Sequence, residues 1–526
     1  MNKVWEIFKK MSWTIGLLMY TFILLVLVLV DRGYNIWFYY SLPISNKWIV
    51  LTWAVFGFGA YHAAKRKKQK KRIYEVKEFG KLPILILLVI QIFVVYHIFF
   101  YVGWDVQYLY EAAHQMLSGG LSDFSQSYFA TNPNNVVMLA INIAFQFLGN
   151  IIGINGYILM AFVGIILVDL AIYWSCKVVE LICGKTIITW CVFGILVILI
   201  GLSPWIMVPY SDVYSICLPI LSVYLYLLFV EKGTEIGWKE YISVYIPTII
   251  GALLKPTNII IGIAIGIVHL FRTISQKGQW KKLGRFFVSI MLVAGACMLV
   301  RQGIYATLDY EPNEYRAKTV MHYMLIGSNA DSGGNYNWED NDYTDSFPTA
   351  KEKNQADWAL VKQRYQQMGL RGMIKHFTIK TDYNFNMGIL GWGKEPDFIN
   401  FKLENNTFIA KFLRNLYYPN EKYVNDRSFG EGGKYFYIYA MITQVIWILV
   451  LVGCWLSCLW GLLTKLSINN NATIIMLATI GITIFVTIFE TNARYLFSYV
   501  PTFAVLFAIS MKKIYGGEVY GHEKDY

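Results

Sequence analysis

Charged side chains are scarce in this chain. They make up 15% of its 526 residues, whereas hydrophobic residues make up 56% and the mean hydropathy is +0.43. Soluble globular domains carry about 25% charged residues, so this composition excludes a soluble protein. Apolar runs long enough to cross a bilayer recur along the chain, and a single span in lipid has to be helical to satisfy its backbone hydrogen bonds. The sequence therefore predicts an all-α polytopic membrane protein.

Negative charge is scarce outside one segment. Residues 305–433 contain 15 Lys/Arg and 17 Asp/Glu, a net charge of −2, whereas the whole chain has 46 and 34, a net charge of +12. The rest therefore carries 31 cations and 17 anions, or +14, which is typical of cytoplasmic loops under the positive-inside rule. The basic run Lys65–Arg72 lies between two predicted spans. We interpret it as a topology anchor that meets anionic lipid, and we expect no nucleic-acid partner.

Disulfide and metal-ligand patterns are also lacking. All seven cysteines fall in or beside apolar runs, so we expect no disulfide framework in the segments outside the membrane. No group of His, Cys and Asp residues has the spacing of a zinc site. The sequence therefore predicts no metal-binding residue.

Twelve apolar runs are predicted to span the membrane. The first follows Lys9 and Lys10 and lacks a small-residue cleavage site after it, so we expect a retained span and not a signal peptide. The predicted spans are 12–30, 48–64, 83–101, 157–176, 186–203, 213–230, 241–254, 257–272, 286–304, 435–463, 472–489 and 494–511.

Lys and Arg residues mark the connections expected on the cytoplasmic side. They lie in 65–81, 177–185, 232–239 and 272–285 and at 512–513. All of these connections fall on the same side of the membrane only if the apolar segment 136–154 does not cross it. This segment contains Asn142 and Gln146, and we interpret it as an interfacial helix on the outer side. Both termini are then cytoplasmic, and five stretches face outward: 101–135, 203–212, 255–258, 305–433 and 490–494.

This topology divides the chain into four parts. Residues 1–82 hold two spans and a basic cytoplasmic loop, and residues 83–304 hold a core of spans with the outer loop 102–135. Residues 305–433 are expected to form an extracellular loop domain of mixed structure, and residues 434–526 hold the last spans and a short cytoplasmic tail.

Two acidic residues adjoin spans on the predicted outer side. Asp105 follows Gly103 and Trp104 just after the third span, and Asp212 precedes a later one. A carboxylate at the water–lipid boundary can stay ionised and still reach a lipid-linked substrate. Asp105 is therefore our candidate for a catalytic base, with Asp212 as a second catalytic carboxylate. Both have a simpler interpretation, since Asp commonly caps the start of a helix.

Two cations lie at membrane depth on the same predicted side. Arg494 precedes an apolar run, and Lys255 lies between two such runs, where a charge is costly unless it is used. With Asn258 and Tyr495 they form a candidate phosphate-binding set, because cations stabilise a departing phosphate. The alternatives are a snorkelling Lys255 and an Arg494 that pairs with Glu490 one helical turn away.

Aromatic, amide and acidic side chains of the same stretches are candidates for holding a sugar or an acceptor. Aromatic rings offer flat apolar faces, and amide and carboxylate groups offer hydrogen bonds. These candidates are Trp104, Tyr108, Glu111, Asn132, Asn134 and Tyr210.

The order of these stretches resembles the GT-C superfamily of membrane glycosyltransferases, which includes protein O-mannosyltransferases, aminoarabinose transferases and the catalytic subunit of oligosaccharyltransferase. The resemblance covers 83–304 and 435–511. It rests on an acidic residue in the first large outer loop (Asp105), a Pro-containing stretch that runs into a juxtamembrane helix (131–135 before 136–154), a second outer loop with Asp212, and a late Arg-Tyr pair before Pro501. The chain departs from the superfamily in two ways. It lacks the DxD pair of the metal-dependent branch, and it has two additional spans before Leu82.

The resemblance implies an inverting, hexosyltransferase-like enzyme in a GT-C-like bundle with outer-face juxtamembrane helices. The donor would be a polyprenyl-phosphate sugar, and the acceptor a glycan, a cell-wall polymer or a lipid-linked glycan on the outer face of a bacterial plasma membrane. Asp105 would act as the base, Arg494 and Lys255 would hold the phosphate, and Asp212 would orient a substrate. A divalent metal is not supported without the DxD pair. Binding of a partner membrane protein is one interpretation of the two additional spans.

Two other classes are compatible with a large outer loop in a polytopic protein. A polysaccharide polymerase or ligase is expected to centre on outer-loop Arg and His residues, whereas the ordered motifs here are acidic. A flippase or transporter of lipid-linked glycans is expected to show two related halves and charges at mid-membrane, and neither pattern is evident in the sequence.

Overall fold

The computed structural model describes residues 2–30, 44–66, 76–231, 237–274, 280–313, 315–392, 401–402, 406–419, 433–463 and 470–515. Within these ranges the protein is helical, apart from one antiparallel pairing of two residues with two, β1 (Phe100–Tyr101) with β2 (Phe401–Lys402). The basic run Lys65–Arg72 lies mostly outside the described residues.

Nine helical segments of the described chain are long and apolar enough to cross a membrane. They contain α1 (Asn2–Leu29), α6 (Val136–Ile152), α7 (Gly156–Cys183), α9 (Ser211–Ser215) with α10 (Cys217–Glu231), η4 (Pro256–Asn258) with α12 (Ile259–Ile274), α13 (Trp280–Thr307), α18 (Phe436–Leu463), α19 (Asn470–Ile488), and η6 (Ala493–Tyr499) with α20 (Val500–Tyr515). Eight of them are among the twelve predicted spans, and α6 is the ninth.

The other four predicted spans are also helices, but shorter or less apolar. Two belong to apolar helices below the length of a full span: α3 (Leu82–Ile98) and α8 (Ile187–Leu196) with its π-helical extension η2 (Val197–Gly201). The remaining two are α2 (Asn46–Arg66) and α11 (Trp238–Leu254). An integral, multi-pass helical protein is therefore confirmed, with nine candidate spans in the described residues.

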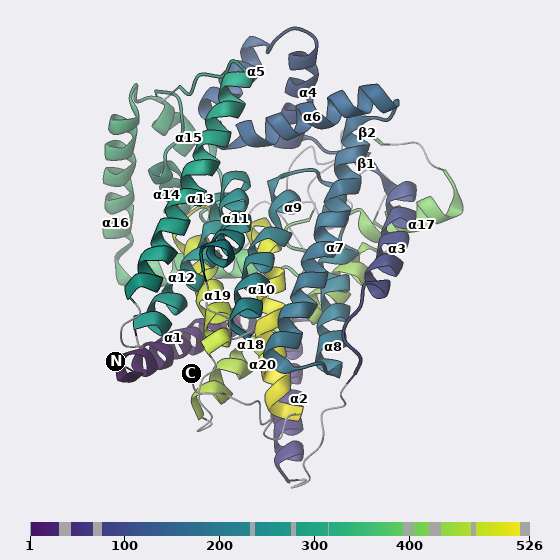
Figure 1. Cartoon of the computed structure of the whole chain (residues 1–526), viewed down its shortest axis with the longest axis vertical. Helices are drawn as coiled ribbons and strands as arrows, with labels where there is room; N and C mark the ends of the chain where they lie inside the picture. Colours follow the sequence, from purple (N-terminus) through teal and green to yellow (C-terminus); the bar gives the residue numbers. More distant parts are fainter. Residues whose placement is uncertain are drawn as a thin grey trace.

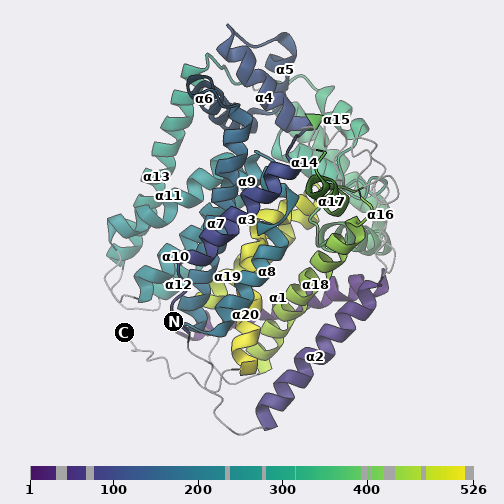
Figure 2. The same cartoon turned by 90° about the vertical axis from the view of Figure 1, so that its right-hand side faces the viewer.

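Helix α6 is oriented differently from its neighbours. By length and composition it could cross a membrane, yet it lies across one end of the bundle, crosswise to α7 (Figures 1 and 2). The turn between them follows from local sequence: α6 ends at Gly153, whose φ of 73° is left-handed, and Asn155 caps α7 by accepting a hydrogen bond from the amide of Tyr157. This orientation fits an interfacial helix.

A mixed domain was predicted over 305–433, and the described residues of this segment are helical apart from β2. Its described part consists of the helices α14 (Val320–Gly327), α15 (Trp338–Asp345), α16 (Ala350–Phe385) and α17 (Phe408–Tyr417), and the pair β1–β2 is its only strand contact in the described residues. Asn and Thr act here as helix starts: Asn337 caps α15 and Thr349 caps α16. The apolar residues Trp358, Val361 and Tyr365 recur at helical spacing and lie within α16, which kinks at Gly369.

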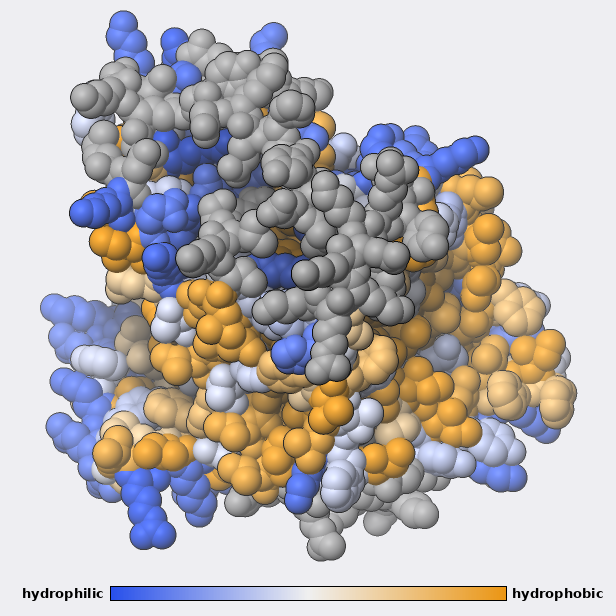
Figure 3. Space-filling model, turned by 90° about the horizontal axis from the view of Figure 1, so that it is seen from below, coloured by the Kyte–Doolittle hydropathy of each residue, from blue (hydrophilic) through white to orange (hydrophobic). Residues whose placement is uncertain are grey.

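The buried core lies between α7, α18 and α20. The ring of Trp447 on α18 packs 5.4 Å from Phe503 on α20. A Cβ on Gly453 would collide with the ring of Phe507, so this glycine permits the close approach of the two helices. The outside of the bundle is apolar along α3 and α13, where Val89, Tyr96 and other large side chains are exposed. Figure 3 shows broad apolar areas of this kind on the face seen from below.

The two ends of the bundle carry different sets of connections. The three short helices α4 (Trp104–Leu117), α5 (Asp123–Thr131) and η1 (Pro133–Asn135) lie with α6, α14 and α15 at the end that we call the site end (Figure 2). The ends of the chain lie away from it: Lys512 on α20 donates to the carbonyl of Ile182, and Lys9 on α1 donates to Asn470. Two of the stretches predicted to face the cytoplasm, 177–185 and 512–513, are therefore in contact.

Candidate functional site

The first candidate residues sit at the start of α4. Gly103 is extended and opens the helix, and Trp104 has a φ of 47°. A left-handed conformation costs a residue other than glycine about 1–3 kcal/mol, and such residues cluster at functional sites. This backbone conformation at the start of α4 sets the directions of two neighbouring side chains, the Trp104 ring and the Asp105 carboxylate.

Two tyrosine hydroxyls donate to the half-buried carboxylate of Asp105. Tyr128 on α5 reaches Oδ1 over 2.8 Å, and Tyr210 reaches Oδ2 over 3.0 Å. Asn135 connects the two donors, because its amide nitrogen donates to the Tyr128 oxygen over 2.7 Å and its Oδ1 accepts from Tyr210 over 3.3 Å. Hydrogen bonds to both of its oxygens therefore hold the Asp105 carboxylate in one orientation.

The two tyrosines remain protonated donors in this setting. Burial, and after it the charge of Asp105, raises the pKa of both Tyr128 and Tyr210 well above 10. A buried phenol beside a carboxylate gives up its proton less readily, because a second negative charge would be added in a medium that solvates it poorly. The Asp105 carboxylate thus has hydrogen-bond donors that stay in place.

Arg494 lies beside the ring of Tyr210, whose hydroxyl donates to Asp105. Its guanidinium carbon is 4.4 Å from the ring centre of Trp104 and 5.6 Å from that of Tyr210. Its side chain is 8% exposed, and Nε is 3.7 Å from Oδ2 of Asp212. The planar guanidinium is thereby stacked on aromatic rings and directed to a carboxylate, an arrangement that favours arginine over lysine.

Asp212 links this arginine to a second cation. Lys255 forms a buried ion pair with Oδ1 of Asp212, and Lys255 and Asp212 are 6% and 3% exposed. Lys255 Nζ also lies 5.3 Å from the ring centre of Tyr495. Two buried cations therefore share the single Asp212 carboxylate. Buried charge of this kind is costly unless it is compensated, so the group is suited to binding an anion.

The structure therefore brings together five predicted residues from four distant stretches: Asp105, Tyr210, Asp212, Lys255 and Arg494. We call these five residues, together with Trp104, the acid–base cluster. They were expected on one face of the membrane, and the contacts above bring them together. Simple helix capping does not describe Asp105 and Asp212, because the carboxylate contacts given above come from other segments of the chain.

The other predicted residues lie around this cluster in secondary positions. Tyr108 packs against Phe124 and Tyr128, and Glu111 accepts a hydrogen bond from Gln107 on its own helix. Three amides bond locally: Asn258 to the carbonyl of Gly251, Asn132 to that of Tyr128, and Asn134 to the side chain of Asn135. Tyr495 donates to Glu490 over 2.9 Å.

Three contributing residues were not among the predicted site residues: Tyr128, Asn135 and Glu490. Tyr128 and Asn135 belong to the same polar stretch as Asn132 and Asn134. The composition of this stretch indicated a site there, but it did not indicate which of its residues contact Asp105. Glu490 was considered only as a partner of Arg494, whereas here it accepts from Tyr495.

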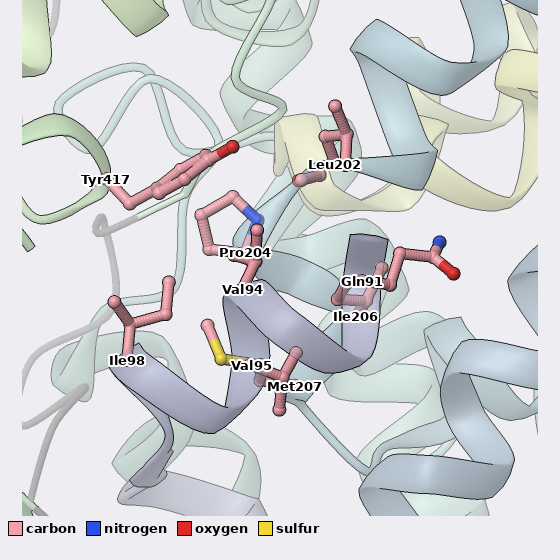
Figure 4. A pocket seen from close by; sticks show the side chains of 10 residues that line it. Gln91, Val94, Val95, Ile98, Leu202, Pro204, Ile206, Met207 and Tyr417 are labelled. Carbon is pink, nitrogen blue, oxygen red and sulfur yellow. The ribbon is translucent and has the colours of Figure 1, made fainter. Parts of the chain in front are cut away.

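A small apolar groove lies on the flank of the bundle near the cluster. It is bounded by α3, by residues 202–207, which include the short helix η3 (Pro204–Met207), and by Tyr417 of α17 (Figure 4). Its lining is apolar except for Gln91, Ser203 and the hydroxyl of Tyr417. Both chain segments that form its walls continue directly into the site: α3 through β1 to Trp104, and η3 to Tyr210.

No group of three or more His, Cys, Asp or Glu side chains in the described residues is arranged to hold a metal ion. The carboxylates of the acid–base cluster instead face hydroxyl, ammonium and guanidinium donors. The arrangement can therefore hold a negatively charged group beside a carboxylate.

The comparisons with known proteins agree with the architecture. A search of curated proteins found no match. The family described as "Conserved hypothetical integral membrane protein" matches residues 7–515, which cover both the bundle and the acid–base cluster. The chain therefore belongs to this family of conserved hypothetical integral membrane proteins.

Proposed function

We propose that the protein is an inverting glycosyltransferase that moves a sugar from a polyprenyl-phosphate donor to an acceptor hydroxyl. One observation carries this proposal: the Asp105 carboxylate accepts from two tyrosine hydroxyls, and the ring of one of them, Tyr210, lies beside a buried arginine that shares Asp212 with Lys255. Such transfer requires a base on one side of the reacting carbon and an anion site on the other.

The reaction assigns one task to each part of the cluster. Asp105 accepts the proton of the acceptor hydroxyl, while the oxygen of that hydroxyl forms a bond to the anomeric carbon. The bond from that carbon to the phosphate oxygen breaks, and the phosphate leaves with both electrons of the bond. Arg494 and Lys255 stabilise the charge that develops on the phosphate, while Asp212 holds the two cations in register.

Two features support a lipid-linked donor. Lys255 and Arg494 are two buried cations that meet at one carboxylate, and paired cations suit the oxygens of a phosphodiester. Helix α3 exposes large apolar side chains along its length and leads into the turn that carries Trp104 and Asp105, so a hydrocarbon chain lying along α3 would remain in contact with the membrane. On this proposal the site end faces outward, and the acceptor is a glycan, a cell-wall polymer or a lipid-linked glycan.

The arrangement of the acid–base cluster is less consistent with the two alternative functions, a polysaccharide polymerase or ligase and a flippase. A polymerase or ligase centred on outer-loop Arg and His is less consistent with a centre built on Asp105 and Asp212. A flippase needs an anion site but no oriented base, so the pair of tyrosine donors on Asp105 would serve no purpose.

Analysis of lipids and cell-surface glycans in a strain that lacks the protein tests the proposal. We expect a polyprenyl-phosphate sugar to accumulate while an acceptor glycan loses that sugar. A matched strain that produces the Asp105→Asn variant should show the same two changes. Normal glycans in both strains would contradict a transferase, and accumulation only in the deletion strain would favour transport over transfer.

A further inference from the structure

Lys380 of α16 is a fully buried amine that contacts neutral groups. Its side chain is 0% exposed. Nζ donates to the carbonyl of Gly327 over 2.6 Å and to that of Phe489 over 2.7 Å. Gly327 ends α14, and Phe489 begins the turn that leads to Arg494. Lys380 therefore ties the helical segment 320–385 to the chain that carries the arginine of the acid–base cluster.

Other contacts hold the same turn. The amide of Thr491 donates to the carbonyl of Gly334 over 2.7 Å, and the side chain of Asn384 donates to that of Val486 over 3.1 Å. A Cβ on Gly327 would collide with the backbone of Ile488 and Phe489, so the two segments are in direct backbone contact. The position of residues 486–492 thus depends on α14 and α16.

The number of hydrogen bonds matches a neutral amine. An uncharged amino group has two N–H donors, whereas an ammonium group has three and also requires compensation of its charge. Burial lowers the pKa of Lys380 to about 7, opposed by the charge of Glu490. Burial also lowers the pKa of His376, which shares the Gly327 carbonyl, to about 4, so this histidine is neutral near pH 7.

We propose that Lys380 is a positioning residue for the anion site, which fixes the turn before Arg494 as a neutral amine and releases it when protonated. The inference rests on the proposed function, because it takes the anion to be the donor phosphate. An added proton needs a third acceptor, and Glu490 is the carboxylate that acts on Lys380. Drawing Glu490 toward Lys380 would take it from Tyr495, whose ring lies 5.3 Å from Lys255 Nζ.

Binding of farnesyl methyl phosphate to the purified full-length protein tests this. The compound is a phosphodiester with one negative charge that does not titrate between pH 6 and 8. If only the neutral form of Lys380 is competent, about one eleventh of the protein is competent at pH 6 and about ten elevenths at pH 8, so Kd should be about tenfold weaker at pH 6. Lys380→Met should abolish this dependence, whereas Lys375→Met, an exposed lysine of the same helix, should keep it.

A wild-type pH dependence in Lys380→Met would overturn the proposal. Lys380→Arg, which is always charged, provides a second variant, and it should bind weakly at both pH values. Tight binding by Lys380→Arg at pH 6 would also overturn the neutral-amine role.

Thermal unfolding without ligand separates this inference from the proposed function. The unfolded chain holds the Lys380 proton up to about pH 10, whereas the folded chain loses it near pH 7. Stability should therefore rise between pH 7 and 9 in the wild type relative to Lys380→Met. An unchanged dependence would refute the neutral amine. Failure of the wild type to bind the diester at either pH, with that rise present, would instead refute the donor site.

Discussion

The guanidinium carbon of Arg494 lies 4.4 Å from the ring centre of Trp104. These residues come from the last candidate span and from the first loop at the site end. A cation over an aromatic ring gains about 0.5–2 kcal/mol, more when both are desolvated. The contact fixes the guanidinium plane, so that one edge is directed to Asp212. The left-handed backbone of Trp104 is thus part of what orients the arginine.

Replacing Asp105 by Asn should abolish transfer while leaving donor binding largely intact. The amide keeps the size of the carboxylate and can still accept from a tyrosine, but it cannot take a proton. A general base contributes about 10²–10⁴-fold in rate, and we expect kcat to fall by that factor. Turnover of a purified polyprenyl-phosphate sugar measures it, with Asp123→Asn, an exposed acid of the same loop, as control. Near-normal turnover would remove Asp105 from the role of base.

Arg494 should tolerate lysine in part and alanine hardly at all. Lysine preserves the charge but loses the planar stack on Trp104 and the two parallel donors that suit a phosphate. The loss should appear in both KM for the donor and kcat, because the phosphate gains charge as the sugar leaves. A purely structural role for this buried arginine would instead lower stability and leave KM and kcat unchanged. Wild-type kinetics of Arg494→Ala would therefore leave it as an anchor without a role at the phosphate.

The members of the acid–base cluster could be selected from the sequence because each adjoins the end of an apolar run. Positive connections indicate which ends share a side, and this brings Asp105, Asp212, Lys255 and Arg494 together without coordinates. The hydroxyls on Asp105 could not be selected in this way. Tyr128 reaches it only because α5 folds back onto α4, and the sequence contains 38 tyrosines.

The prediction of a mixed domain over 305–433 differs from the described helices for a related reason. Asn and Gly residues indicate turns, but they also begin and end helices. Asn337 accepts from the amide of Asp340 as the cap of α15, and Gly369 interrupts α16 without ending it. Composition alone does not distinguish a polar loop from a series of short capped helices.

The crosswise position of α6 leads to a labelling prediction. Cysteines introduced at Asn134 and Asn155, both exposed and at opposite ends of α6, should both react with an impermeant reagent added outside intact cells. Lys185→Cys, on the connection predicted inside, should react only after the membrane is opened. Labelling of position 155 only from inside would mean that α6 crosses, and that the later connections face the other way.

The last prediction separates the charge of Asp212 from any direct chemical role. Asp212 contacts two cations, with Oδ1 paired to Lys255 and Oδ2 3.7 Å from Arg494. Breaking a buried pair by removing one partner typically costs about 3–5 kcal/mol, because the remaining charge stays buried. Asp212→Asn should therefore lower the unfolding temperature of the purified protein, whereas Asp331→Asn, at an exposed position, should not.

Two further measurements on this variant decide the role. Adding Lys255→Met removes one of the two uncompensated cations, so the double variant should recover part of the lost stability. Farnesyl methyl phosphate should stabilise Asp212→Asn more than the wild type, because the ligand then replaces the missing negative charge. If Asp212→Asn is as stable as the wild type and binds the diester no better, Asp212 does not compensate the two cations. A fall in kcat would then assign it to the substrate.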